Sequence, residues 1–271
     1  MADTLSLLVL TIIPLGFLWS LLKAYRLPSD YTSLEKVLYA PVYCFGRLLW
    51  RIEIVSSVPV NDRKTALGDA GAVLVSNHRN SLDPFFLQLA CGRRVHWLVA
   101  GEYFKNPVFG PVLRTFQAIP TNRSGSDSAS VKTAIRLVAE GRLVGMFPEG
   151  KINRSKSPIL KIRAGAALVA TKANSPLLPC WIEGAPRGWD VWSGWFTAAH
   201  IKVFIGQPVY FNERDGLPPV VCDQSKVEPM QHHDTDQFIE TAMKQSLTMA
   251  GYRDCSVDLA RKRLNHLRPV S

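Results

Sequence analysis

Short apolar runs alternate with helical stretches from about residue 60 onward, and this alternation constrains the fold more than any other feature. The expected strands are rich in β-branched and apolar residues. They cover residues 72–77, 95–100, 142–147, 176–184 and 200–211. The expected helices have Asp or Ser near their beginnings and Gly or Asn near their ends. They cover residues 83–92, 128–141, 164–174 and 234–252. The pattern predicts an α/β domain with a mainly parallel sheet flanked by helices.

A run of about eighteen uncharged residues, 5–22, precedes this domain. A membrane-crossing helix needs roughly 20 such residues. No basic residue precedes the run, which argues against a cleaved signal peptide. Lys23 and Arg26 follow it, so the positive-inside rule places the rest of the chain in the cytoplasm. Pro14 and Gly16 would kink a spanning helix, so a re-entrant or interfacial helix and a buried core helix both stay open as alternatives.

Residues 34–55 mix aromatic and aliphatic side chains with Lys36, Arg47 and Arg51. This composition is typical of a helix in the lipid headgroup region. An ordinary amphipathic helix packed on the domain fits equally well. We therefore divide the chain into N-terminal membrane-anchoring or interfacial helices, 1–55, and an α/β domain, 56–271.

The charge of the chain indicates an anionic partner. Lysines and arginines number 32 against 22 acidic residues, a formal charge of +10. Nucleic acid, an anionic membrane or a phosphorylated ligand would each satisfy this balance. We find no basic helix with readable spacing and no aromatic RNA-binding motif, so no nucleic-acid partner is expected. The membrane accounts for the charge.

The five cysteines are scattered and form no CxxC pair. This spacing gives neither a zinc site nor a redox motif. Reduced thiols in a cytosolic compartment fit it best.

The stretch SNHRNSLDPF (76–85) places a histidine and an aspartate where an expected strand ends and an expected helix begins. Open α/β sheets bind ligands beyond the carboxyl ends of their strands, which is where His78 falls. Asp83 can accept the Nδ1 proton of His78 and stabilise the imidazolium that forms when Nε2 takes a proton. An aspartate before Pro84 also fits a helix N-cap, and one carboxylate can do both.

Two further stretches carry candidate binding residues. In FPEGKINR (147–154), Glu149 follows a strand and can hydrogen-bond substrate hydroxyls, while Lys151 and Arg154 can pair with a phosphate. A turn with solvated charges is the alternative. The segment 105–123 ends at Arg123, which on its own would be a solvated arginine.

The order of these motifs closely resembles the glycerolipid acyltransferase family. This is the lysophosphatidate acyltransferase-like superfamily (1-acylglycerol-3-phosphate acyltransferases), which acylates glycerol phosphates and lysophospholipids. The resemblance covers about 70–185. It rests on NHxxxxD (77–83), IPxxR (119–123), FPEG (147–150) and PLLP (176–179).

The resemblance implies a direct acyl transfer. His78 would deprotonate the acceptor hydroxyl and Asp83 would orient His78. The hydroxyl would attack the thioester of acyl-CoA or acyl-carrier protein, the co-substrate, without an acyl-enzyme, a cofactor or a metal. The residues implied in substrate binding are Asn80, Lys105, Arg123, Glu149, Gly150, Lys151 and Arg154.

Two departures from the family pattern concern the acceptor. Asn80 stands where the family commonly has serine, and FPEG is followed by Lys-Ile-Asn-Arg (151–154) instead of Thr-Arg-Ser. The cation that reads a phosphate therefore stays open among Lys151, Arg154 and Arg163.

We expect a membrane-associated acyltransferase with its catalytic domain on the cytoplasmic side. Its partners would be membrane phospholipids, the acyl donor and a lyso-lipid acceptor, with lysophosphatidic acid the favoured acceptor. A non-phosphorylated lyso-lipid acceptor and a catalytically silent lipid-binding protein are the alternatives. The aromatic stretch 188–196 fits an acyl channel, a bilayer contact or a packed loop.

Overall fold

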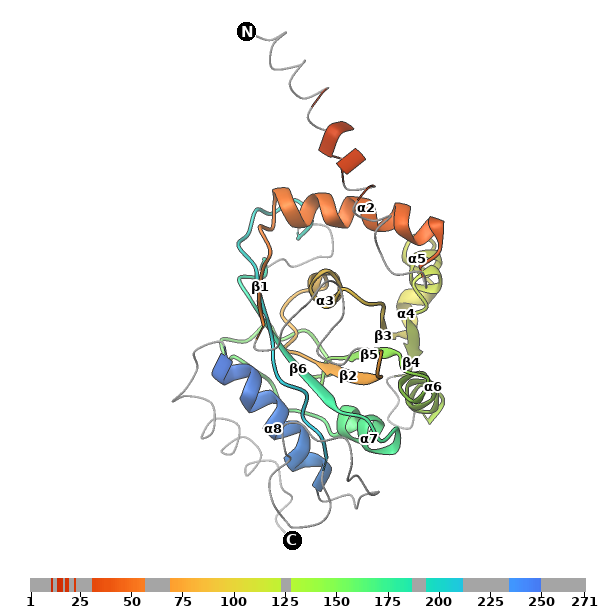
Figure 1. Cartoon of the computed structure of the whole chain (residues 1–271), viewed down its shortest axis with the longest axis vertical. Coiled ribbons are helices and arrows are strands. Elements are labelled where there is room, and N and C mark those ends of the chain that lie inside the picture. Colours follow the sequence, from red (N-terminus) through yellow and green to blue (C-terminus); the bar gives the residue numbers. More distant parts are fainter. Residues whose placement is uncertain are drawn as a thin grey trace.

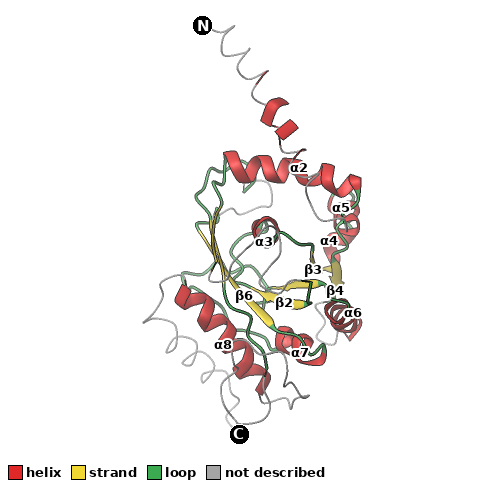
Figure 2. Cartoon of the chain, viewed as in Figure 1, coloured by secondary structure: helices red, strands yellow, loops and turns green. Residues whose placement is uncertain are grey.

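The computed structural model describes residues 31–56, 69–122, 128–186, 194–211 and 234–249, and within the N-terminal segment only positions 11, 14–16, 18, 19 and 22. In this part of the chain, seven strands form one sheet with helices on both faces (Figures 1 and 2). The strands are β1 (Glu53–Ser56), β2 (Ala72–Val75), β3 (Val95–Ala100), β4 (Ile119–Thr121), β5 (Leu143–Met146), β6 (Leu177–Glu183) and β7 (Lys202–Ile205). The helices are α2 (Ser33–Leu48), α3 (Asp83–Cys91), α4 (Gly101–Phe104), α5 (Phe109–Thr115), α6 (Ser128–Ala139), α7 (Gly165–Lys172) and α8 (Asp234–Met249).

The sheet has the strand order β1-β7-β6-β2-β5-β3-β4. The strands from β6 to β4 pair in parallel, β7 pairs antiparallel with β6, and β1 pairs in parallel with β7. In the register at the centre of the sheet, Val73 of β2 faces Val144 of β5 and Leu177 of β6. The mainly parallel α/β fold expected from the alternation is confirmed.

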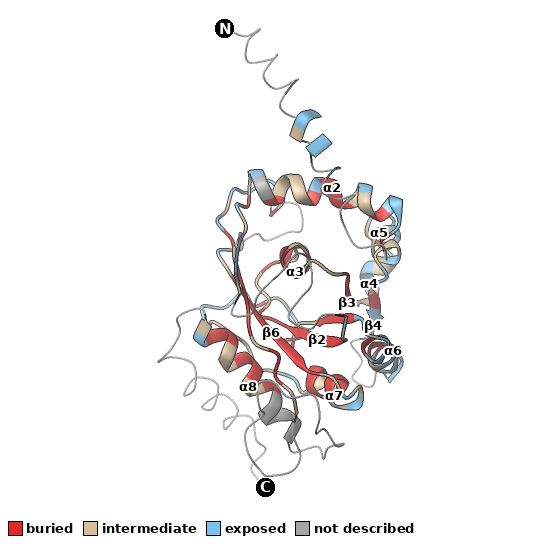
Figure 3. Cartoon of the chain, in the orientation of Figure 1, coloured by how far each residue is buried: buried red, intermediate tan, exposed pale blue. Residues whose placement is uncertain are grey.

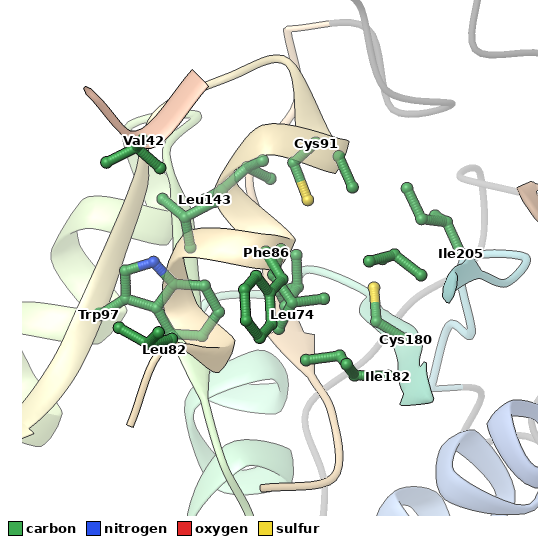
Figure 4. Close-up of a cluster of buried hydrophobic side chains, with 14 of the residues drawn as sticks. Val42, Leu74, Leu82, Phe86, Cys91, Trp97, Leu143, Cys180, Ile182 and Ile205 are labelled. Carbon is green, nitrogen blue, oxygen red and sulfur yellow. The ribbon is translucent and has the colours of Figure 1, made fainter. Parts of the chain in front are cut away.

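Alternate residues of the central strands divide the core into two apolar layers. Leu74 joins the layer under α2 and α3, which Figure 4 shows in close-up, whereas Val73 joins the layer covered by α6, α7 and α8. Both side chains are fully buried. A central parallel strand has both faces covered, and its sequence is therefore an uninterrupted apolar run.

The helix expected across 34–55 is confirmed for Ser33–Leu48 and wrong beyond it. The chain turns at Arg51, whose φ is 37°, and Glu53–Ser56 then pairs with β7 as an edge strand. Strand β4 and the short helices α4 and α5 were also not expected. Each is a few residues long, too short for a periodic pattern to develop.

None of the helices in the described residues is both long and apolar enough to cross a bilayer. Most of the apolar run 5–22 lies outside those residues, so the prediction for it is untested.

Three cysteines fall within the described part of the chain, Cys44, Cys91 and Cys180, and all are free thiols. Burial raises the pKa of the Cys91 thiol to about 12, with a smaller opposing effect of Arg93. These thiols are free, as expected for reduced cysteines.

Asn77 connects the end of β2 to β6 through two hydrogen bonds. Its Nδ2 donates to the Ile182 carbonyl at 2.9 Å, and the Ile182 amide donates to its Oδ1 at 2.8 Å. The side chain thus continues the β2–β6 pairing for one more step, two residues beyond the last residue of β2. It fixes the position from which the chain enters the next loop.

Replacing Asn77 by alanine should destabilise the fold, because two buried backbone groups of Ile182 lose their partners. Each unsatisfied group costs about 1–3 kcal/mol. Urea unfolding followed by tryptophan fluorescence measures the loss. Asn77→Asp keeps the acceptor and loses the donor, so this variant tests the donated hydrogen bond alone. An alanine variant as stable as wild type would contradict the role of this side chain.

Candidate active site

His78 and Asp83 meet at the carboxyl end of β2. The Nδ1 of His78 lies 2.9 Å from Asp83 Oδ2. The Asp83 side chain is fully buried, while that of His78 keeps 16% of its surface exposed. The Nε2 atom makes no hydrogen bond to any residue that the structure describes, so it is the ring nitrogen available to a substrate. The pair predicted from the sequence is therefore in contact.

The Asp83 carboxylate is held from the loop that precedes α3. Its Oδ2 also accepts hydrogen bonds from the amides of Arg79, at 2.6 Å, and Asn80, at 2.8 Å. The N-cap of α3 is Leu82, without a side-chain cap bond. The capping arrangement considered for Asp83 is thus absent, and the carboxylate instead fixes the turn and the histidine together.

The imidazole of His78 lies on an aromatic stack. Its ring is 4.0 Å from the Phe147 ring at an interplanar angle of 13°, and Trp97 stacks on the other face of Phe147 at 5.1 Å and 13°. Gly145 makes room for the indole, since a Cβ there would lie 2.3 Å from Trp97 Cε3. The negative face of an aromatic ring attracts a cation, so Phe147 is placed to favour a positively charged imidazole.

Glu149 joins the catalytic loop to a distant segment. Its Oε1 accepts from the His78 amide and its Oε2 from the Leu160 amide, both at 2.8 Å. The residue is buried, and loss of solvation raises the pKa of the carboxyl above its ordinary value, although the two amides act in the opposite direction. The structure thus shows Glu149 supporting the backbone of His78, while its role in holding the substrate glycerol stays a prediction.

A second set of contacts connects the loop after β2 to the loop after β5. The Asn153 amide donates to the His78 carbonyl at 2.7 Å. Arg79 Nη1 donates to the carbonyls of Asn153, at 3.3 Å, and Ser155, at 2.8 Å. The contacts of Arg79 and Asn153 were not predicted from the sequence. The residues that they join lie more than seventy positions apart in the chain, and no local sequence pattern indicates such contacts.

The other predicted binding residues divide into a buried group and an exposed group. Asn80 is buried, donates to the Pro186 carbonyl and accepts from the Leu82 amide at 2.9 Å, so it stabilises the loop. Lys105, at the end of α4, is exposed, as are Gly150, Lys151 and Arg154. Arg123 lies outside the described residues. The substrate-binding roles of all of these residues stay predictions.

Comparison with known proteins gives a consistent result. A family model described as Acyltransferase matches residues 19–183. A 1-acyl-sn-glycerol-3-phosphate acyltransferase of Bacillus subtilis (strain 168) is 27% identical over 177 residues, 65% of this chain and 85% of that protein. An N-acylphosphatidylethanolamine synthase of Arabidopsis thaliana is 27% identical over 178 residues, 58% of this chain and 62% of that protein.

A solved structure resembles the chain over most of its length. The crystal structure of the 1-acyl-sn-glycerophosphate (LPA) acyltransferase PlsC from Thermotoga maritima matches with a TM-score of 0.56 and 18% sequence identity, covering 87% of this chain and 88% of that one. At this identity the match concerns the fold.

Glu149→Gln should weaken both activity and stability, because a glutamine amide presents a donor to one of the two backbone amides. The loss should be about 1–3 kcal/mol for the unpaired group. Because the pKa of Glu149 is raised in the folded state, protonation of this carboxyl stabilises the fold. This contribution to the free energy of unfolding is fully present below about pH 4.5 and is lost as pH rises through the folded-state pKa.

The stability advantage of wild type over Glu149→Gln should therefore be larger at pH 4 than at pH 7.5, as measured by urea unfolding. Glu140→Gln, an exposed site, is the control and should change stability by less than about 0.5 kcal/mol. An advantage that grows with pH would contradict the direction of the shift.

Proposed function

The chain belongs to the acyltransferase family, and we propose that it transfers a fatty acyl group from an acyl thioester to the free hydroxyl of a lysophospholipid, with lysophosphatidic acid as the favoured acceptor. The observation that carries this proposal is the His78–Asp83 contact of 2.9 Å, which leaves Nε2 without a hydrogen bond to any residue that the structure describes. A general base next to the acceptor hydroxyl is what such a transfer needs.

The reaction needs no group outside the chain and its two substrates. The acceptor oxygen attacks the thioester carbonyl carbon while its proton passes to His78 Nε2. Asp83 holds the Nδ1 proton and stabilises the imidazolium, and the Phe147 ring favours the same charge. The tetrahedral intermediate then collapses, the carbon–sulfur bond breaks, and the leaving thiolate takes the proton from Nε2.

Lysophosphatidic acid is the acceptor that the relatives support best. Proteins named 1-acyl-sn-glycerol-3-phosphate acyltransferase recur among them, from Bacillus subtilis and from Limnanthes douglasii. Exposed cations near the loop after β5, Lys151 and Arg154, suit a phosphate headgroup. Because one relative is named an N-acylphosphatidylethanolamine synthase, an amine-bearing phospholipid is the second acceptor to test. For the donor, acyl-CoA and acyl-carrier protein carry the same thioester.

The proposed place of the enzyme is the cytoplasmic face of a membrane. The outer side of α2 carries an apolar row of exposed residues: Leu34, Val37, Pro41 and Leu48. They are spaced by three, four and seven residues and so lie along one side of the helix. Figure 3 shows exposed positions recurring along α2, whose other side is buried. Leu15, Leu18 and Leu22 in the N-terminal segment and Phe196, 73% exposed, add further apolar surface.

Helix α2 is rigidly attached to the catalytic domain. Glu35 forms a capping box with Thr32 at its start and an ion pair of 2.7 Å with Arg94, which precedes β3. Both partners are buried, so the charge pair is protected from solvent and salt. A membrane bound through the apolar row of α2 would thus have a fixed orientation relative to the active site.

The activity is tested by thiol release from a long-chain acyl-CoA offered with a panel of lyso-lipid acceptors. Release should depend on the acceptor and be fastest with lysophosphatidic acid. His78→Ala should lower kcat by about 10²-fold or more, because a general base contributes about 10²–10⁴-fold. Asp83→Asn should act in the same direction by disturbing the histidine tautomer.

Acceptor-dependent release by His78→Ala at the wild-type rate would remove His78 from the mechanism. Absence of release with every acceptor, and again with acyl-carrier protein as donor, would favour a lipid-binding protein without turnover.

Membrane binding is tested by the paired substitution Leu34→Asp and Leu48→Asp. Burying one leucine side chain contributes about 1.5–3 kcal/mol, so the partition onto anionic vesicles should fall by about 10-fold or more. The paired substitution Ser128→Asp and Ala129→Asp, at two exposed positions of α6, adds the same two charges and is the control. Vesicle sedimentation measures the partition, and an unchanged value would contradict docking through α2.

A further inference from the structure

The guanidinium of Arg163 lies against Gly150, the last residue of the FPEG motif. A Cβ built on Gly150 would stand 3.1 Å from Arg163 Cζ and Nε and 3.2 Å from Nη1. Gly150 also has a φ of +68°, in the left-handed region that side chains other than glycine rarely adopt. Glycine therefore serves here both for the turn and for the close approach of a planar cation to the backbone.

The position of Arg163 is fixed by the same turn that supports the catalytic histidine. The Arg163 amide donates to the Pro148 carbonyl at 2.9 Å, and the Leu160 amide donates to Glu149 Oε2 at 2.8 Å. The other carboxylate oxygen of Glu149 holds the His78 amide. A short series of backbone contacts thus connects the segment 160–163 to His78, and the guanidinium lies one residue beyond Glu149.

The donors of Arg163 are available for a ligand. The side chain is exposed and makes no hydrogen bond or ion pair with any residue that the structure describes. A guanidinium carries five N–H donors in a rigid plane that matches the oxygens of a phosphate, and it stays charged at any physiological pH. Packing against Gly150 fixes part of this plane in advance, which lowers the entropy lost on binding.

The other candidate cations have weaker support. Arg154 already has a partner within the protein. Lys151 is exposed on the turn, and a lysine presents a single flexible point charge instead of a planar fork. The position two residues after Gly150, where the family pattern has arginine, is Ile152 in this chain.

We propose that Arg163 is the specificity-determining residue that binds the phosphate of the acceptor, in a site built by the guanidinium against Gly150. This inference rests on the proposed acyl transfer to a lysophospholipid. The recognised chemistry is a phosphate monoester, which two sources could supply: the headgroup of lysophosphatidic acid, and the 3′-phosphate of coenzyme A on the donor. We assign it to the acceptor, and the experiment separates the two.

The experiment measures KM and kcat of wild type, Arg163→Gln and Arg163→Lys with two acceptors and two donors. The acceptors are lysophosphatidic acid and monoacylglycerol, which lacks the phosphate. The donors are an acyl-CoA and the same acyl group on N-acetylcysteamine, which carries no phosphate. Lys132→Gln on α6 also removes one exposed positive charge and is the matched control.

Arg163→Gln should raise the KM for lysophosphatidic acid by about 10- to 100-fold, the loss of a charge-assisted hydrogen bond. The KM for monoacylglycerol and for either donor should stay within about twofold. The KM of Arg163→Lys for lysophosphatidic acid should lie between those of wild type and Arg163→Gln, because the charge remains and the planar guanidinium is lost. Gly150→Ala should imitate Arg163→Gln if the variant folds, since the added Cβ displaces the guanidinium.

Three results would overturn the assignment. An unchanged KM for lysophosphatidic acid in Arg163→Gln refutes it and leaves the acyl transfer intact. A raised KM for acyl-CoA alone shows that Arg163 binds the phosphate of the donor. An equal loss of activity with lysophosphatidic acid and with monoacylglycerol shows a structural role for Arg163. Wild type without any acceptor-dependent transfer refutes the proposed function and this inference together.

Discussion

The parallel pairing of β2 with β5 is the constraint on which the active site depends. It brings the loops after both strands to the same edge of the sheet, so that His78 of one meets Glu149 and Asn153 of the other. Single hydrogen bonds of this kind contribute modestly, about 0.5–1.5 kcal/mol each. Buried together at one edge, they hold the histidine backbone from two sides, and the Asp83 carboxylate then needs only to fix the ring.

Much of this arrangement could be predicted from the sequence. The central strands carry continuous apolar runs because both of their faces are covered, and such runs are visible without a structure. The spacing of His78 and Asp83 at a strand–helix junction indicated their contact. The edge strand β1 could not be predicted in this way. Its residues Glu53–Ser56 include only two apolar side chains in succession, too few for a recognisable run, and they form a strand by pairing with β7.

The contacts around the site were less predictable for the same reason. Glu149 was predicted to hydrogen-bond a substrate hydroxyl, because a carboxylate beside glycine at a strand end can do so, and that role stays a prediction. Its contacts with the amides of His78 and Leu160 were not predicted, because backbone amides leave no signature in a sequence. Likewise, nothing marks Gly145 as the place where an indole ring passes, although a methyl group there would collide with Trp97. Sequence patterns indicate which residues can react, whereas long-range packing decides what holds them.

The series of contacts from His78 through Glu149 to the segment 160–163 has a consequence for regiochemistry. A phosphate bound by Arg163 and a hydroxyl bound by His78 would be held at a fixed separation, because the same backbone contacts position both side chains. The enzyme would then select acceptors by the number of bonds between the phosphate and the free hydroxyl. An isomeric acceptor with its free hydroxyl one carbon nearer to or farther from the phosphate would bind at the headgroup and still miss the base. Positional selectivity on the glycerol would then follow from the stiffness of a turn, with no residue needed to exclude the wrong isomer.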